Sequence, residues 1–153
     1  KLLVGLGILT DAELESRFNI RLERYIKDML IEMHTLKEIV DTQVLPAAFS
    51  YLATLTGSAA EAKTAGVKVI PQIDAANELG ALIKELRTKR VAMGKVLDKA
   101  EHMHEAPEKT ARLLTADGAG AMAAVRANCD AIELSIADDA WPLPKYREML
   151  FPV

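Results

Sequence analysis

The chain has 153 residues, of which 50% are hydrophobic and 27% are charged, and its formal net charge is −3. This composition predicts one globular domain that can build a core without disulfides, and the lack of a basic block argues against binding to nucleic acid or to an anionic membrane surface. The single cysteine, Cys129, excludes an internal disulfide and favours a cytoplasmic location, and no apolar run approaches the roughly 20 residues of a membrane span.

The amino terminus has neither the basic region nor the small-residue cleavage site of a signal peptide. It begins at Lys1 rather than at a methionine and continues directly into apolar residues. Two explanations are open: removal of a tag or start methionine, or a segment cut from a longer protein. We favour the segment of a longer protein.

A long helix is predicted over residues 10–56. Thr10 and Glu13 have the spacing of a capping box, and apolar residues recur from Leu14 to Val44 at steps of three and four. Pro46 is expected to kink or break this helix near Leu45. Such a rod would span nearly 70 Å, which is too long for the core of one small bundle. Part of it is therefore expected to face another body.

Two further helical segments are predicted, over residues 70–105 and 110–137, while residues 58–66 form either a short helix or a polar turn. The second helix begins near Pro71, and its expected apolar stripe includes Ile73 and Val91 (or Arg90). Together these patterns predict an all-α fold: an elongated antiparallel bundle of about three long helices, formed by residues 1–153 as one domain. Residues 138–153 form an aromatic, proline-containing tail.

The histidines do not predict a metal site. His102 and His104 are two positions apart, which places them on different sides of a helix, and only His34, Glu101 and Glu105 could complete a zinc site. We therefore interpret the histidines as solvated, with a metal site as the weaker alternative.

No other motif indicates catalysis. Asp117–Gly120 follows no strand and lacks the lysine of a phosphate loop, so a flexible turn is favoured. Cys129 lies on the apolar stripe of the last helix, which predicts a buried structural thiol. No catalytic, cofactor-binding or metal-ligating residue is assigned.

Two stretches resemble a known family. The first is Leu9–Leu55, with Glu15-Ser16-Arg17-Phe18 near its start, and the second is DDAWPLPKYREMLF, Asp138–Phe151. Together they resemble the C-terminal helical region of type III glutamine synthetase, the large bacterial form of that enzyme. The tail is the more specific match, because tryptophan and proline at fixed offsets rarely coincide by chance.

The resemblance implies a parent enzyme of glutamine biosynthesis that joins ammonia to glutamate using ATP and a divalent metal, Mg²⁺ or Mn²⁺. Those functions belong to a preceding catalytic domain, so none is transferred to this chain. What the resemblance implies for the chain itself is a cytoplasmic structural and assembly domain, which packs on its own catalytic domain and on neighbouring subunits of a homo-oligomeric ring. The alternative is a free-standing helical bundle that binds a protein or a small ligand.

The tail is the predicted docking element. Its aromatic and apolar side chains are expected to be buried against a helical bundle or another subunit rather than exposed to water. The candidate docking residues are Trp141, Pro142, Leu143, Tyr146, Leu150 and Phe151.

Overall fold

The computed structural model describes residues 2–68, 70–103 and 106–150, and these residues form helices and no strand, which confirms the all-α prediction. Two π-helical turns, η1 and η2, and one short 3₁₀ helix, η3, accompany the α-helices. The elements in chain order are α1 (Leu2–Gly5), α2 (Asp11–Ile39), η1 (Val40–Val44), α3 (Leu45–Thr64), α4 (Ile70–Glu101), α5 (Pro107–Leu113), η2 (Leu114–Gly118), α6 (Ala119–Glu133), η3 (Asp138–Ala140) and α7 (Tyr146–Leu150).

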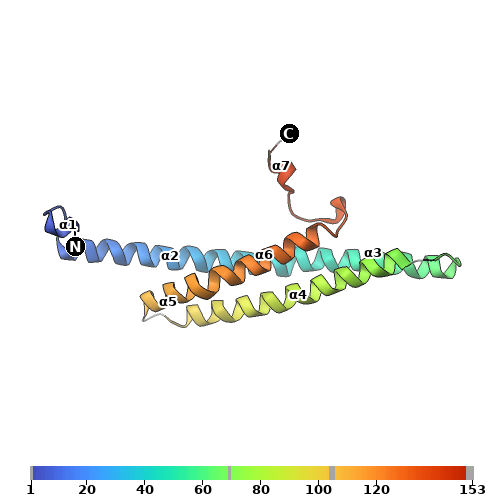
Figure 1. The fold of residues 1–153 in the computed structure, drawn as a ribbon, viewed down its shortest axis with the longest axis horizontal. Coiled ribbons are helices and arrows are strands. Elements are labelled where there is room, and N and C mark those ends of the chain that lie inside the picture. The colour runs from blue at the N-terminus through green and yellow to red at the C-terminus, as the bar shows by residue number, and fades with distance from the viewer. Residues whose placement is uncertain (1, 69, 104–105, 151–153) are drawn as a thin grey trace.

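These elements form three rods that lie along one another (Figure 1). The first rod is α2–η1–α3, which runs for 54 residues, or about 80 Å. The second is α4, which turns back along the first rod after a connection in which Gly66 adopts a φ of +77°, in the left-handed region that glycine favours. The third is α5–η2–α6, and α7 stands apart from the bundle (Figure 1).

The predicted capping box starts the first rod. The Thr10 hydroxyl accepts a hydrogen bond from the Glu13 backbone N–H at 3.2 Å, and the Thr10 N–H donates to the Glu13 carboxylate at 2.8 Å. The hydrogen bonds that the Thr10 backbone N–H and then the Thr10 hydroxyl donate to the Glu13 carboxylate lower the pKa of Glu13. The capping-box prediction is confirmed.

The core occupies the middle of the bundle, where all three rods meet. In the first rod the buried residues run from Met33 to Ala48, and none lies before Met33. Phe18, on the same predicted stripe, is 51% exposed. The stripe therefore extends well beyond the core, as expected for a rod that is longer than its own bundle. The largest fully buried side chains are Met33, Val40, Val44, Leu79, Leu86, Met93, Leu97, Leu114, Val125 and Ile132.

The buried face of α4 differs in part from the predicted stripe. Ile73 is 46% exposed, so its predicted place in the core is wrong. Of the two alternatives Val91 and Arg90, Val91 is 49% exposed and Arg90 is the one on the buried side of α4. From Leu86 the buried face continues through Arg90 to Met93, at steps of four and three residues. Arg90 can occupy this position because it forms an ion pair with the first rod, described below.

Pro46 does not break the first rod. It lies in the first turn of α3, and the Leu45 N–H immediately before it donates to the Val40 carbonyl five residues back. The wider π-helical turn thus lies where the sequence predicted a disruption. Beyond it, α3 continues to Thr64, so the helical alternative for residues 58–66 is correct.

The prediction of a flexible turn at Asp117–Gly120 is wrong. Asp117 and Gly118 belong to η2, which continues directly into α6, and Gly118 is buried. A Cβ atom at Gly118 would lie 3.4 Å from Leu114 Cδ2 and 3.5 Å from Met33 Sδ. Gly118 is therefore packed between the first and third rods, with room for a Cβ atom but not for a larger side chain.

Candidate docking surfaces

The first half of the tail packs on the chain's own bundle. Trp141 follows η3, is only 8% exposed and belongs to the core cluster together with Ile136. Ala140 and Leu143 are partly buried and pack against the same cluster. The indole Nε1 of Trp141 has no hydrogen-bond partner. This half of the tail therefore covers part of the chain's own helical bundle.

The second half of the tail leads away from the bundle (Figure 1). Lys145 forms an ion pair with Asp138, and its backbone N–H donates to the Glu148 carboxylate at 3.0 Å, which caps α7. Met149 and Leu150 on α7 are 61% and 58% exposed. Of the other predicted docking residues, Pro142 is exposed, the side chain of Tyr146 is not described, and Phe151 lies outside the described residues.

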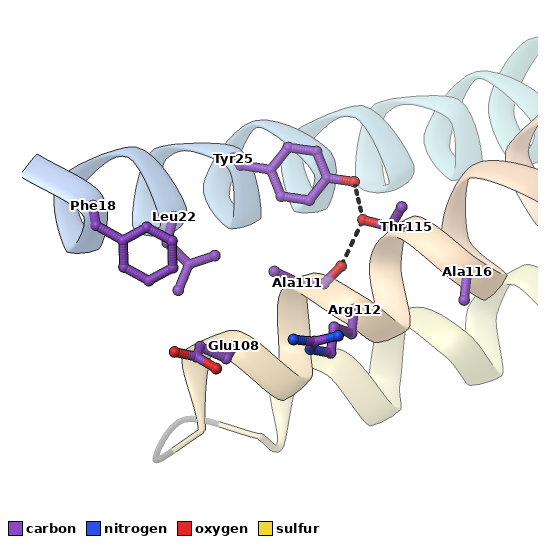
Figure 2. A pocket seen from close by; sticks show the side chains of 8 residues that line it. All are labelled: Phe18, Leu22, Tyr25, Glu108, Ala111, Arg112, Thr115 and Ala116. Atoms are coloured by element: carbon purple, nitrogen blue, oxygen red, sulfur yellow. Dashed lines mark hydrogen bonds between the residues drawn. The ribbon is translucent and has the colours of Figure 1, made fainter. Parts of the chain in front are cut away.

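Several grooves run between the rods. The first, the α2–α5 groove, has a volume of about 730 Å³. Figure 2 shows Phe18, Leu22 and Tyr25 of α2 facing the third rod across it. The Thr115 hydroxyl donates to the Ala111 carbonyl at 2.8 Å, so the Tyr25 hydroxyl, also 2.8 Å away, donates to Thr115. The remaining lining residues are Glu108, Arg112 and Ala116.

The second groove, the α3–α4 groove, has a volume of about 690 Å³. Its apolar residues include Phe49 and Val91, which are 47% and 49% exposed. Its charged residues are all cations. The groove is lined by Phe49, Leu52, Gly80, Ile83, Lys84, Arg87, Thr88, Val91, Ala92 and Lys95.

The third groove, the α2–α6 groove, has a volume of about 510 Å³ and a more uniformly apolar lining. One carboxylate, Glu32, and one guanidinium, Arg126, give it charges of both signs. The two signs are also balanced in the α2–α5 groove, by Glu108 and Arg112, so the α3–α4 groove differs from both. The other residues lining the third groove are Met29, Ile31, Thr35, Leu36, Ile39, Ala119, Met122 and Ala123.

Polar side-chain contacts link α4 to the first rod and to the third rod. Arg90 of α4 holds the Asp41 carboxylate of η1 with two hydrogen bonds, one of them 2.8 Å from Nε to Oδ1. This hydrogen bonding raises the pKa of Arg90. The buried Asn128 of α6 donates from Nδ2 to the Leu82 carbonyl of α4 at 3.2 Å. Sequence reasoning missed both contacts, although a charged residue in line with the Leu86–Met93 face was a signal for Arg90.

The structure brings together only two of the described residues that were candidates for a metal site, His34 and Glu101. His34 Nε2 lies 2.7 Å from Glu101 Oε1, while His102 Nδ1 lies 2.6 Å from its own helix's Asp98 carbonyl. His104 and Glu105 lie outside the described residues. In the described part of the chain no three His, Cys, Asp or Glu residues are grouped to hold a metal ion, and no helix is long and apolar enough to cross a bilayer.

Cys129 is 8% exposed, as the stripe on α6 predicted. Burial raises the pKa of its thiol to about 11, which suppresses the nucleophilic thiolate at neutral pH. The described surface carries grooves between the rods and exposed apolar side chains.

The family model and the individual relatives that this chain matches agree with one another. Residues 1–63 match the model for the glutamine synthetase C-terminal domain. The chain is 31% identical, over 97% of its length, to a glutamine synthetase of Bacteroides fragilis, and 28% identical, over 99%, to the type-3 glutamine synthetase of Dictyostelium discoideum. The resemblance to the glutamine synthetase C-terminal region is confirmed. A glutamine synthetase of Butyrivibrio fibrisolvens is 32% identical over 95% of the chain.

The family match is unevenly distributed along the fold. The glutamine synthetase C-terminal domain model ends at residue 63, so within the bundle it covers the first rod and none of α4 or α6. The alignments to individual glutamine synthetases extend over 95–99% of the chain and so include the other two rods. The chain spans 21% of the length of each of these three relatives.

Proposed function

We propose that this chain is the C-terminal structural and assembly domain of a type III glutamine synthetase. The observation that carries the proposal is its match, almost end to end, to glutamine synthetases of which it spans about a fifth. In this role it packs on a catalytic domain of the same protein and on neighbouring subunits. The parent enzyme makes glutamine from glutamate and ammonia with ATP and Mg²⁺ or Mn²⁺, in the cytoplasm, as a homo-oligomeric ring.

The exposed area of the chain supports an assembly role. Its accessible surface is 10575 Å². A compact monomer of 16.7 kDa is expected to expose roughly 7,600 Å². The excess of roughly 3,000 Å² exceeds the roughly 800 Å² that each partner contributes to a standard protein interface. An elongated rod with this much surface has room for more than one partner.

The exposed apolar residues lie where such partners could bind. Phe18 and Ile20, near the start of α2, are 51% and 62% exposed, and they lie outside the bundle core. Met149 and Leu150 are exposed on α7, which stands apart from the bundle (Figure 1). These two sites lie on different elements, which fits contacts to two bodies rather than to one.

The proposal is tested in the intact parent protein. We expect Phe18→Glu combined with Leu150→Glu to shift the particle mass, measured by analytical ultracentrifugation, toward smaller species, and to lower glutamine synthesis in parallel. The control is Asn77→Glu, at an exposed position that lines none of the three grooves. Helical circular dichroism identifies any variant that has simply unfolded.

Two results would overturn the proposal. One is a parent reading frame that encodes no synthetase domain. The other is a folded double variant that keeps both its particle mass and its activity. Tight binding of a small ligand by this chain in isolation would instead favour the alternative of a free-standing ligand-binding bundle, whose site would lie between the helices.

A further inference from the structure

The α3–α4 groove combines an uncharged wall with a cationic one. Residues 45–60 of α3 contain no charged side chain, and Phe49 and Leu52 from this stretch line the groove. On α4 the lining residues Lys84, Arg87 and Lys95 are all cations, and no Asp or Glu lines the groove. This local charge is opposite to the net charge of −3 of the whole chain.

The cations of the groove are available for a partner. Lys84, Arg87 and Lys95 form no ion pair with any described residue. Their neighbours on α4 do: Lys89 lies 2.7 Å from Glu85, and Arg90 is paired with Asp41. Two cations of the same helix outside the groove are thus paired, while the three inside it have no counter-charge among the described residues.

The dimensions of the groove fit a helix. Its lining on α4 runs from Gly80 to Lys95, a rise of about 22 Å, or about four helical turns. Ile83 and Val91 supply apolar surface along this length, and Gly80 leaves one end without a side chain. An amphipathic helix lays a stripe of apolar residues into a groove of this kind, with its polar residues toward the edges.

We propose that the α3–α4 groove binds an amphipathic helix whose apolar stripe is flanked by carboxylates. The apolar residues of the groove cover the stripe, and Lys84, Arg87 and Lys95 pair with the flanking carboxylates. The three cations of this groove are complementary to a helix that carries carboxylates. The α2–α5 and α2–α6 grooves each carry both signs of charge, so they do not share this preference. The inference concerns the chain's own surface and holds independently of the assembly role proposed above.

The apolar floor distinguishes this occupant from other anionic partners. Nucleic acid presents phosphates and base edges to cations and gains little from Leu52, Ile83 and Val91. An anionic membrane favours a convex face with many cations, whereas this is a recessed site with three. The experiment therefore also tests binding to nucleic acid and to an anionic membrane.

The probe is a fluorescein-labelled helical peptide of about 16 residues, matched to the length of the groove, with leucines at steps of three and four and glutamates beside them. Its control has lysine at every glutamate position. We expect the acidic peptide to bind the full chain and the basic peptide not to bind, by fluorescence anisotropy. Binding of the acidic peptide is also expected to weaken as salt is raised, because the rim charges are solvent-exposed.

Matched variants locate the site. Lys84→Glu, Arg87→Glu and Lys95→Glu together are expected to weaken binding by about tenfold or more, since each reversal turns an attraction into a repulsion. A second variant, Phe49→Ala, removes apolar contact without changing charge and is expected to weaken binding of the acidic peptide as well. The control reverses three exposed cations that do not line this groove: Arg21, Lys68 and Lys109.

Several outcomes would overturn the inference. They are equal binding of the basic peptide, unchanged binding after reversal of the three groove cations in a variant that keeps its helical circular dichroism, and loss of binding in the control triple as well. Capture of the chain by phosphatidylserine vesicles or by single-stranded DNA through the same three cations, without peptide binding, would assign the groove to those partners instead. Self-association that the groove variant abolishes would assign it to a second copy.

Discussion

The π-helical turns η1 and η2 interrupt two different rods among different neighbours. In both, the residue that follows donates its N–H five residues back: Leu45 to Val40 in the first rod and Ala119 to Leu114 in the third. η1 comes immediately before the first turn of α3, which contains Pro46, whereas η2 contains Gly118 and no proline. A π-helical turn therefore occurs next to a proline in the first rod and without a proline in the third rod.

The difference shows what holds such a turn in place. Proline cannot donate a hydrogen bond, and its ring crowds the carbonyl four residues back, so a wider turn before Pro46 relieves a local conflict. At η2 no proline is present, and a Cβ atom at Gly118 would lie in ordinary van der Waals contact with Met33 of the first rod. In both turns the first and last residues are buried. The shared requirement is that apolar residues on both sides of the turn face the core.

The largest expected effect comes from filling the contact at η2. Gly118→Leu forces side-chain atoms against Leu114 and Met33, and overpacking of this kind costs about 1–3 kcal/mol. Gly118→Ala adds only a Cβ atom at van der Waals distance, so we expect it to be tolerated. The free energy of unfolding is measured by urea denaturation followed by circular dichroism.

Gly120 provides the matched control for this prediction. A Cβ atom at Gly120 would meet nothing within 4 Å, and the residue is exposed. Gly120→Leu is therefore expected to change stability by no more than about 0.5 kcal/mol in the destabilising direction. Equal losses at the two glycines would show that contact between the rods at Gly118 does not decide the cost.

Much of the fold could be predicted because its signals are local. The capping box of Thr10 and Glu13 spans three residues, and the apolar steps on α6 place Val125, Cys129 and Ile132 in the core. Pro46 marked the position of η1. By contrast, Gly118 was interpreted as part of a flexible turn, because the sequence contains no sign of the Met33 side chain that approaches it.

The surfaces were less predictable because they depend on pairs of rods. Asp41 and Arg90 are 49 residues apart, and Tyr25 and Thr115 are 90 apart, so neither contact leaves a periodic signal. The aromatic tail was predicted to be a docking element, but the sequence does not divide it at Lys145 into an inner and an outer half. Only the packing of Trp141 on the bundle shows that division.

A smaller effect is expected from the polar link between η1 and α4. Asp41→Asn weakens the charge-assisted pair with Arg90, and we expect a loss of about 1 kcal/mol, because both side chains are only partly exposed, at 34% and 27%. Asp28→Asn is the control. Its pair with Arg24 is longer, 3.6 Å, with side-chain exposures of 59% and 82%.

The comparison of these two carboxylates tests whether the link is structural. Asp28→Asn is expected to change the unfolding free energy by less than about 0.5 kcal/mol, because exposed pairs on one helix contribute little. If both variants lose the same amount in thermal or urea unfolding, Asp41 contributes no more than an ordinary surface pair. The link between η1 and the second rod would then have to come from apolar packing alone.

The smallest expected effect is that of Pro46→Ala, and it decides between the two accounts of η1. Alanine restores an N–H donor, which contributes about 0.5–1.5 kcal/mol if it is bonded, and it loses the chain stiffening of proline, about 0.4–1 kcal/mol. These terms oppose each other, so we expect the stability measured by urea unfolding to change by less than about 1 kcal/mol. If packing holds η1, the π-helical turn persists in the variant.

The opposite result has a distinct signature. If the proline alone imposes η1, its removal lets the rod relax to a regular α-helix, and every residue beyond the turn rotates by roughly 100° about the helix axis. Ala48 would leave the core, and the contact between α3 and α4 would be rebuilt. Amide hydrogen exchange along α3 and α4 would then change over many residues, whereas persistence of η1 confines the change to the neighbourhood of residue 46. Because Val40, Val44 and Ala48 are all fully buried across the turn, we expect the confined change.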